Sequence, residues 1–164
     1  MRTAIRDANW LGRDRALAWA RLLAIGSVLA VVGLFVVTRF GTAPDPLGRP
    51  LGTDFSSFWT AARLALAGIP VAAWHPAAHG ALQHASFPPS AGFKNAYYAF
   101  FYPPPFLLLC LPFGALPYGA ALALWLVLTG AAYFAAVRRL LPRSWPALTV
   151  LIAFPALLIN AGQG

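Results

Sequence analysis

The sequence contains no glutamate, a single cysteine and few charged residues of any kind. Charged residues make up 10% of its 164 residues, whereas a typical soluble domain has about 25%. With 60% of residues hydrophobic, too little polar surface remains to cover a water-soluble globule, so lipid is expected to be the solvent for much of the chain. The lone Cys110 excludes an intramolecular disulfide and lies in an apolar run, as a small buried hydrophobe does.

The charge that is present is mostly positive, with 12 Lys and Arg against 4 Asp. The arginines flank apolar segments instead of forming one surface stripe: Arg2, Arg6, Arg13, Arg15 and Arg21 precede the first segment, and Arg138, Arg139 and Arg143 lie between later ones. Membrane topology and anionic lipid head groups place positive charge in this way. We therefore expect membrane lipids and no nucleic acid as partners, and a cytoplasmic N-terminus.

The hydrophobic runs predict an all-α protein with several transmembrane helices. A basic cytoplasmic or interfacial segment, residues 1–21, precedes a transmembrane helix at residues 22–39. No clear small-x-small cleavage site follows this helix, which favours a retained anchor over a cleaved signal peptide. Further transmembrane helices are expected at residues 118–137 and 145–160. The sequence stops at Gly164 without a polar tail, so we expect the N-terminal part of a longer protein.

Residues 103–116 leave two topologies open. If this short segment crosses the membrane fully, Arg138 and Arg139 lie outside the cell, against the positive-inside rule. If it is short or re-entrant, these arginines return to the cytoplasm. Both topologies place residues 40–102 outside the cytoplasm.

The loop of residues 40–102 is predicted to contain two amphipathic helices. Phe55, Phe58 and Trp59 recur at helical spacing, while Ser56, Thr60 and Arg63 fall on another face, which predicts a helix near residues 55–67. Pro76 is a favourable first-turn residue for a second helix near residues 76–86. The aromatic cluster at residues 97–102 is typical of a membrane interface.

Asp54 is the most informative polar residue of the loop, because it directly precedes the first predicted helix. One interpretation is an N-cap whose carboxylate accepts hydrogen bonds from the first turn, worth about 1 kcal/mol. The other is a general base at the membrane surface. The two roles are compatible.

Histidines supply the next candidate group. His75 and His79 are four residues apart, a spacing that would place two imidazoles on one helical face for a metal. Pro76, however, places His75 at the helix start, and no glutamate is present to complete a common zinc site. We therefore expect no metal, and polar contacts to a phosphate or sugar, or solvation, for these side chains.

Other polar side chains are candidates for substrate contacts. Arg63 and Lys94 are cations within the loop, where they would bind a phosphate or face solvent. Asn160 and Gln163 follow an apolar segment, where polar groups are often functional, although helix capping explains Asn160 equally well. No Gly-rich phosphate loop, Ser–His–Asp arrangement or paired-cysteine site is present, which disfavours the soluble enzyme classes.

Several blocks together resemble glycosyltransferase family 87, whose members are multi-span transferases of the GT-C fold class. The first block is residues 52–68, GTDFSSFWTAARLALAG, followed by Ala78-His79 and Gln83. The likeness continues through residues 101–108, FYPPPFLL, and Leu116-Pro117-Tyr118, and it ends in residues 154–164, FPALLINAGQG. The Asp-Phe and Tyr-Pro-Pro-Pro-Phe blocks, in this order and spacing, are its most specific part.

The resemblance implies transfer of a hexose, often mannose, from a polyprenyl-phosphate donor to a lipid or glycan acceptor on the outer face of the cell membrane. It implies that Asp54 is the catalytic base. We further expect that no cofactor is needed, and that substrate contacts come from Arg63, His79, Gln83, Lys94, Tyr102, Asn160 and Gln163. Many relatives have Tyr-Asp where this chain has Trp74-His75, so a second acid is missing here. The 164 residues are expected to be inactive without the rest of the protein.

Two rival functions remain at this stage. A non-enzymatic membrane scaffold or transporter component would show no donor-dependent activity and would tolerate substitution of Asp54. A metal-dependent membrane hydrolase using His75 and His79 would contain zinc and lose activity with a chelator.

Overall fold

The computed structural model describes residues 12–41, 43–45, 48–87, 97–140, 149, 159–160 and 162–164. In this part of the chain the regular structure is entirely helical, which confirms the predicted all-α class. The elements in chain order are α2 (Arg13–Val37), α3 (Thr53–Leu66), the 3-10 helix η1 (Pro70–Trp74), α4 (Pro76–Ser86), α5 (Pro104–Gly114) and α6 (Tyr118–Leu140).

Helices α2 and α6 are long and apolar enough to cross a membrane, by length and composition. Their apolar side chains are hardly buried within the protein, as the exposure of Leu29 (65%) and Val127 (66%) illustrates. The core helix of a soluble protein would hide such residues, so these surfaces are suited to lipid. The protein is therefore membrane-associated. Helix α2 begins at Arg13, nine residues before the apolar run expected to form the first span.

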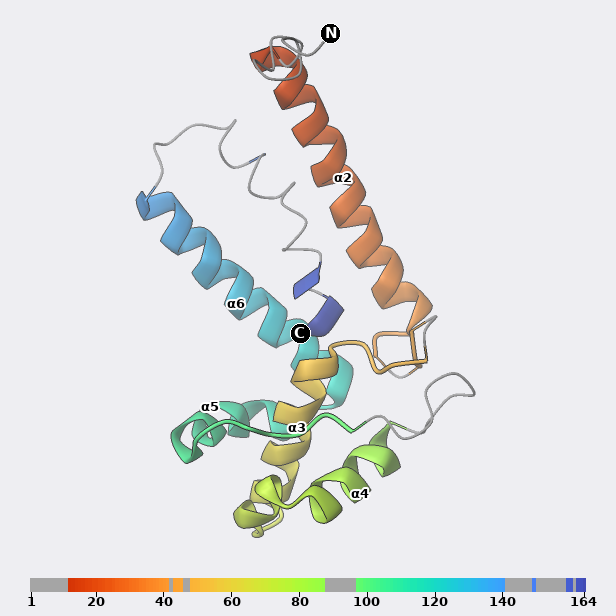
Figure 1. Cartoon of the computed structure of the whole chain (residues 1–164), viewed down its shortest axis with the longest axis vertical. Helices are drawn as coiled ribbons and strands as arrows, with labels where there is room; N and C mark the ends of the chain where they lie inside the picture. The colour runs from red at the N-terminus through yellow and green to blue at the C-terminus, as the bar shows by residue number, and fades with distance from the viewer. Residues whose placement is uncertain are drawn as a thin grey trace, which may run out of the picture.

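The smaller helices gather at one end of the molecule (Figure 1). Helices α2 and α6 extend from this end to the same side, with opposite chain directions. Consequently Arg15, near the start of α2, and Arg138 and Arg139, in the last turn of α6, lie away from α3, α4 and α5.

Helix α5 lies across the direction of α6 (Figure 1). Its 11 residues span about 16 Å at 1.5 Å per residue. A bilayer core is about 30 Å thick, so α5 is too short to cross it. Pro112 inside α5 and Pro117 just after it limit further extension of this helix.

Helix α3 is the centre of the small-helix unit and packs against α5, η1 and α4. Ten of its 14 residues are buried, including Ser56 and Thr60, which were expected on a different face from the aromatic residues. Their hydroxyls donate hydrogen bonds within the helix, from Ser56 Oγ to the Thr53 carbonyl at 2.6 Å and from Thr60 Oγ1 to the Ser56 carbonyl at 2.7 Å. Because small hydroxyls can be satisfied in this way, they can be buried at little cost. The hydroxyl-bearing residues of α3 are therefore buried, while its charged residues Asp54 and Arg63 are exposed.

The start of α3 is fixed against α6. Tyr118 of α6 is buried and donates hydrogen bonds to the carbonyls of Leu51 and Gly52. Gly52 has a φ of 71°, and a Cβ at this position would lie 2.7 Å from Cδ1 of Leu122. The segment after α2 packs against the same end of α6. At Gly119 the two backbones approach so closely that a Cβ would lie 1.9 Å from the Phe40 carbonyl oxygen.

The last described residues return to the N-terminus of α3. The Gly52 amide donates a 3.0 Å hydrogen bond to the carbonyl of Gly162, and a Cβ on Gly164 would lie 2.5 Å from Cβ of Phe55. The expected transmembrane helix at residues 145–160 falls mostly outside the described residues.

Candidate functional site

Asp54 is the second residue of α3, and its side chain is exposed. The N-cap is Gly52, which is in the left-handed conformation, and no side chain caps the helix. The prediction that Asp54 is the N-cap was therefore wrong, because the helix begins at Thr53 and its N-cap lies two residues before Asp54. The carboxylate still lies in the first turn, where the helix dipole favours negative charge.

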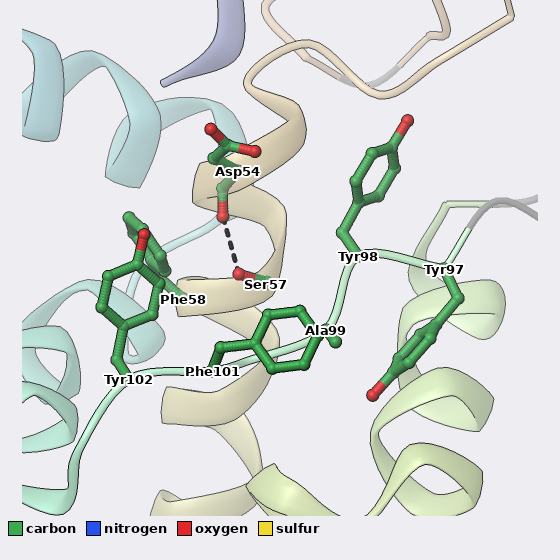
Figure 2. Close-up of a pocket in the computed structure, with 8 residues that line it drawn as sticks. All are labelled: Asp54, Ser57, Phe58, Tyr97, Tyr98, Ala99, Phe101 and Tyr102. Carbon is green, nitrogen blue, oxygen red and sulfur yellow. Dashed lines mark hydrogen bonds between the residues drawn. The ribbon is translucent and has the colours of Figure 1, made fainter.

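A pocket of about 310 Å³ lies beside Asp54, between α3 and the extended segment of residues 97–102 (Figure 2). Helix α3 contributes Asp54, Ser57 and Phe58, whose spacing of three and four residues places them on one face. The segment contributes Tyr97, Tyr98, Ala99, Phe101 and Tyr102. Figure 2 shows the carboxylate at one edge of the pocket, with Phe58 and Tyr102 on one side and Tyr98 on the other.

Tyr102 forms a fixed aromatic wall. Its ring stacks on Phe106 with centroids 4.5 Å apart and meets Phe58 edge to face at 5.0 Å. The indole nitrogen of Trp74 donates a 2.9 Å hydrogen bond to the Tyr102 carbonyl, which holds the backbone as well. Even so, Tyr102 remains 41% exposed and the adjacent Phe101 is 87% exposed, so both rings are available to a ligand.

Gln83 of α4 holds the segment in place. Its Oε1 accepts a hydrogen bond from the Tyr98 amide at 2.9 Å, and its Nε2 donates to the Tyr98 carbonyl at 3.3 Å and to Ser56 Oγ at 3.2 Å. The side chain is 2% exposed and does not line the pocket. The structure thus places Gln83 behind the pocket wall, where it positions Tyr98.

His79, which is also on α4, supports α3 beside Gln83. It is fully buried, and its Nε2 donates a 3.1 Å hydrogen bond to the Ser57 carbonyl, which can only accept. Burial lowers the pKa of His79 below 6.5, opposed by the hydrogen bond to Ser57, so the imidazole is neutral near pH 7. Its Nδ1 is buried without a partner among the described residues.

The paired-histidine hypothesis is not supported by this placement, since His79 turns inward and His75 is exposed at the helix start. Across the ranges that the structure describes, no three His, Cys or Asp side chains come together to hold a metal ion.

The phenol of Tyr98 has a buried oxygen and is influenced electrostatically by the Asp54 carboxylate. Its pKa is raised, chiefly by burial, while Arg49 lowers it and Asp45 and Asp54 raise it further. The phenol therefore stays protonated and able to donate a hydrogen bond. Within the described part of the chain, its buried oxygen has no hydrogen-bond partner.

The guanidinium of Arg63 is not directed toward the Asp54 carboxylate. Its guanidinium carbon lies 5.4 Å from the ring centroid of Trp59. Nine residues of helix separate it from Asp54, which corresponds to about 13.5 Å along the axis and about half a turn around it. Lys94 lies outside the described residues.

Asn160 and Gln163 are exposed and flank Gly162, whose carbonyl is bonded to Gly52. The structure therefore brings the segment of Asn160 and Gln163 beside the N-terminus of α3. The predicted residues that gather at the pocket are Asp54 and Tyr102.

Sequence reasoning did not assign Ser57, Phe58, Tyr97, Tyr98 and Phe101 to the site. Ser57 and Phe58 could have been found from their helical spacing to Asp54. The cluster at residues 97–102 was noticed, but no local pattern shows that it packs against α3.

The structure thus defines an all-helical membrane protein with an aromatic pocket that carries a carboxylate at its edge. The family model of glycosyltransferase family 87 matches residues 100–164, which confirms the predicted resemblance over that part of the chain. The match covers 65 of the 164 residues and makes this part of the chain similar to membrane glycosyltransferases, which use a sugar donor and an acceptor. No curated protein and no solved structure matches the chain.

Proposed function

We propose that the protein acts in the transfer of a hexose, specifically mannose, from a polyprenyl-phosphate donor to a lipid or glycan acceptor. The observation that carries this proposal is the exposed carboxylate of Asp54 at the edge of an aromatic pocket, in a chain that matches a glycosyltransferase family. Aromatic faces suit the C–H surface of a pyranose, and a carboxylate suits removal of a hydroxyl proton.

The proposed topology is a multi-pass protein of the cell membrane with a cytoplasmic N-terminus. The arrangement of α2 and α6 supports it, because Arg15, Arg138 and Arg139 lie at the end away from the pocket. The positive-inside rule assigns that end to the cytoplasm and the pocket to the extracytoplasmic side. The shortness of α5 also supports this topology, because a segment that does not cross the membrane leaves Arg138 and Arg139 on the cytoplasmic side.

In the proposed reaction Asp54 takes the proton of the acceptor hydroxyl as its oxygen attacks the anomeric carbon of the donor. The new bond joins that oxygen to the anomeric carbon, and the bond from this carbon to the phosphate oxygen breaks. The polyprenyl phosphate leaves with the electron pair as a stable anion. This route needs proton transfer and positioning from the protein, and general-base catalysis supplies about 10²–10⁴-fold.

The proposal is tested with Asp54→Asn, which keeps the shape of the side chain and removes the base. Synthetic mannosyl polyprenyl phosphate is supplied to membranes, and sugar transfer is measured. The protein is expressed from the full reading frame of its gene. The exposed Asp14 of α2 provides the matched control, Asp14→Asn.

We expect Asp54→Asn to lose transfer by about 10²-fold or more while inserting into membranes as the wild type does. Asp14→Asn should keep the wild-type rate. Near-normal turnover by Asp54→Asn would remove this residue as the base. Absence of donor-dependent transfer by the wild-type full reading frame would overturn the transferase and favour a membrane scaffold or transporter component.

A further inference from the structure

Helix α5 is apolar on all sides. None of its 11 residues, PPFLLLCLPFG, has a charged, hydroxyl or amide side chain. One face packs against α3 and contains the buried Leu107, Cys110 and Phe113. The opposite face exposes Leu108 (68%) and Leu109 (64%), as much as the apolar side chains of α2 and α6 are exposed. A helix that is hydrophobic all round needs an apolar environment on both faces.

The link to α6 determines where the exposed face lies. Helix α5 ends at Gly114 and α6 begins at Tyr118, so residues 115–117 join them. The 23 residues of α6 span about 35 Å, little more than a bilayer core of about 30 Å, so its first turn lies near one boundary of that core. Because α5 lies across α6 at this end (Figure 1), its whole length stays near the same boundary.

The start of α5 has no free backbone amide. The first four N–H groups of an ordinary helix lack a partner within the helix. Here the N-cap Pro103 and the first two helical residues, Pro104 and Pro105, have no N–H group, and the amide of Phe106 donates a 2.9 Å hydrogen bond to the Pro103 carbonyl. An unpaired amide is strongly disfavoured in lipid, where no water can replace the missing partner. This end of α5 can therefore enter lipid without leaving a donor unpaired.

The other short helices of the same unit begin differently. Helix α3 has no proline in its first turn, and α4 has Pro76 at its first position alone. Both keep N–H groups at positions where α5 has proline, and such groups need water or another partner. Among these three helices, the helix that is apolar all round is thus the one whose start lacks free donors.

We infer that α5 is an in-plane membrane anchor, which lies parallel to the bilayer surface within the acyl chains of the leaflet on the pocket side, with Leu108 and Leu109 against lipid tails. The inference does not depend on sugar transfer. The ring of Phe106 stacks on Tyr102 with centroids 4.5 Å apart, so the anchor also holds this pocket wall at the boundary between lipid and water, where tyrosine is common.

A nitroxide scan in lipid nanodiscs tests the environment of the exposed face. The chain has a single cysteine, the buried Cys110, so Cys110→Ala gives a background in which one introduced cysteine is labelled at a time. Labels at Leu108 and Leu109 are compared with two exposed reference positions, Val127 within α6 and Ala77 in the first turn of α4. Accessibility to oxygen, which concentrates in lipid, and to a water-soluble nickel chelate is measured at each position.

We expect the labels at Leu108 and Leu109 to be accessible to oxygen and shielded from nickel, at a shallower depth than the label at Val127. The label at Ala77 should be accessible to nickel. Nickel accessibility at Leu108 and Leu109 equal to that at Ala77 would mean a water-facing helix and would overturn the inference. Low accessibility to both reagents would mean that protein covers this face, and would overturn it as well.

A second pair of labels tests the orientation of α5. Leu108 and Ala115 are both exposed and lie seven residues apart, on the same face of the helix. Their labels should have equal depths in an in-plane helix, whereas a helix along the bilayer normal would separate them by about 10 Å. A difference of that size would show that α5 enters the membrane end-on, against the inference.

The prolines are tested with the double variant Pro104→Ala/Pro105→Ala, which adds two amides at the start of α5. Nickel accessibility of the label at Leu108 should rise about twofold or more, because the helix end moves toward water to satisfy them. Pro76→Ala, which adds one amide at the start of α4, is the matched control and should change nothing. Unchanged accessibility in the double variant would overturn the link between the prolines and the depth of α5.

A measurement on the unmodified chain removes any dependence on the Cys110→Ala background. Phosphatidylcholine with a photoreactive diazirine on one acyl chain should attach to the peptide that contains Leu108 and Leu109, and not to the peptide that contains Ala77. Mass spectrometry locates the adducts. Absence of adducts on α5 would overturn the inference and leave the proposed function standing.

Discussion

The amide of Gly52 donates a hydrogen bond of 3.0 Å to the carbonyl of Gly162. This contact places the end of the stretch that matches the glycosyltransferase family beside the first turn of α3, which lies outside that stretch. Asp54 lies two residues after Gly52 and shares that turn. The first turn of α3, which carries Asp54, is therefore joined to the segment of Gly162, and Gly52 lies at this junction in a left-handed conformation.

Gly52→Ala should destabilise the protein at this junction. The positive φ of 71° disfavours any residue with a Cβ, and the new methyl group would lie 2.7 Å from Leu122. The left-handed conformation costs about 1–2 kcal/mol for a non-glycine residue, so the free energy of unfolding should fall by at least that amount. Thermal unfolding in detergent micelles measures it.

Gly130→Ala in α6 is the control for this substitution. Gly130 lies within a helix and a Cβ there would meet nothing within 4 Å, so stability should stay the same or rise slightly. Equal unfolding temperatures for Gly52→Ala and the wild type would contradict the proposed constraint.

Gln83→Met should release the segment that lines the pocket. Methionine has a similar volume but makes none of the hydrogen bonds that Gln83 forms with Tyr98 and Ser56. The Tyr98 amide should exchange with solvent faster, with a loss of about 1–2 kcal/mol in its opening free energy. Hydrogen exchange followed by mass spectrometry or NMR measures this at the residue concerned.

Gln163→Met provides the matched comparison, because Gln163 is exposed. It should leave the protection of the Tyr98 amide unchanged. If Gln83→Met also left that protection unchanged, the positioning role of Gln83 would be excluded.

His79 should make stability depend on pH. Its pKa in the folded protein is below the unfolded value of 6.5 because burial disfavours the charged form. The unfolded chain therefore binds the proton more readily. The stabilising contribution is fully present above pH 6.5 and is lost as the pH falls through the folded pKa. Unfolding free energies measured from about pH 8 down to about pH 5 should decrease.

His79→Gln should flatten this decrease, because glutamine does not titrate. His75→Gln should keep it, since His75 is exposed and makes no side-chain cap at the start of α4. An unaltered pH profile in His79→Gln would show that another group is responsible.

The order of helices follows from local patterns in the sequence. The helix expected near residues 55–67 spans Thr53–Leu66, and the helix at residues 76–86 spans Pro76–Ser86. Helical spacing, Pro76 and the breaks at Gly68 and Pro70 are all properties of neighbouring residues. The first residue of α3 was missed because Gly52 caps the helix through a left-handed backbone conformation and not through a side chain.

The sequence by itself determined that this chain is helical and associates with membranes, and it singled out Asp54, because composition, apolar runs and an acid at the start of the predicted loop helix are visible without a fold. Only the tertiary structure decided what surrounds Asp54. Residues 97–102 line the pocket because they pack against α3, and Gln83 holds Tyr98 in place through hydrogen bonds. His79 is directed toward α3, whereas Arg63 lies over Trp59 and away from Asp54. All of these placements depend on how whole helices and segments pack together, which side-chain spacing within one helix cannot specify.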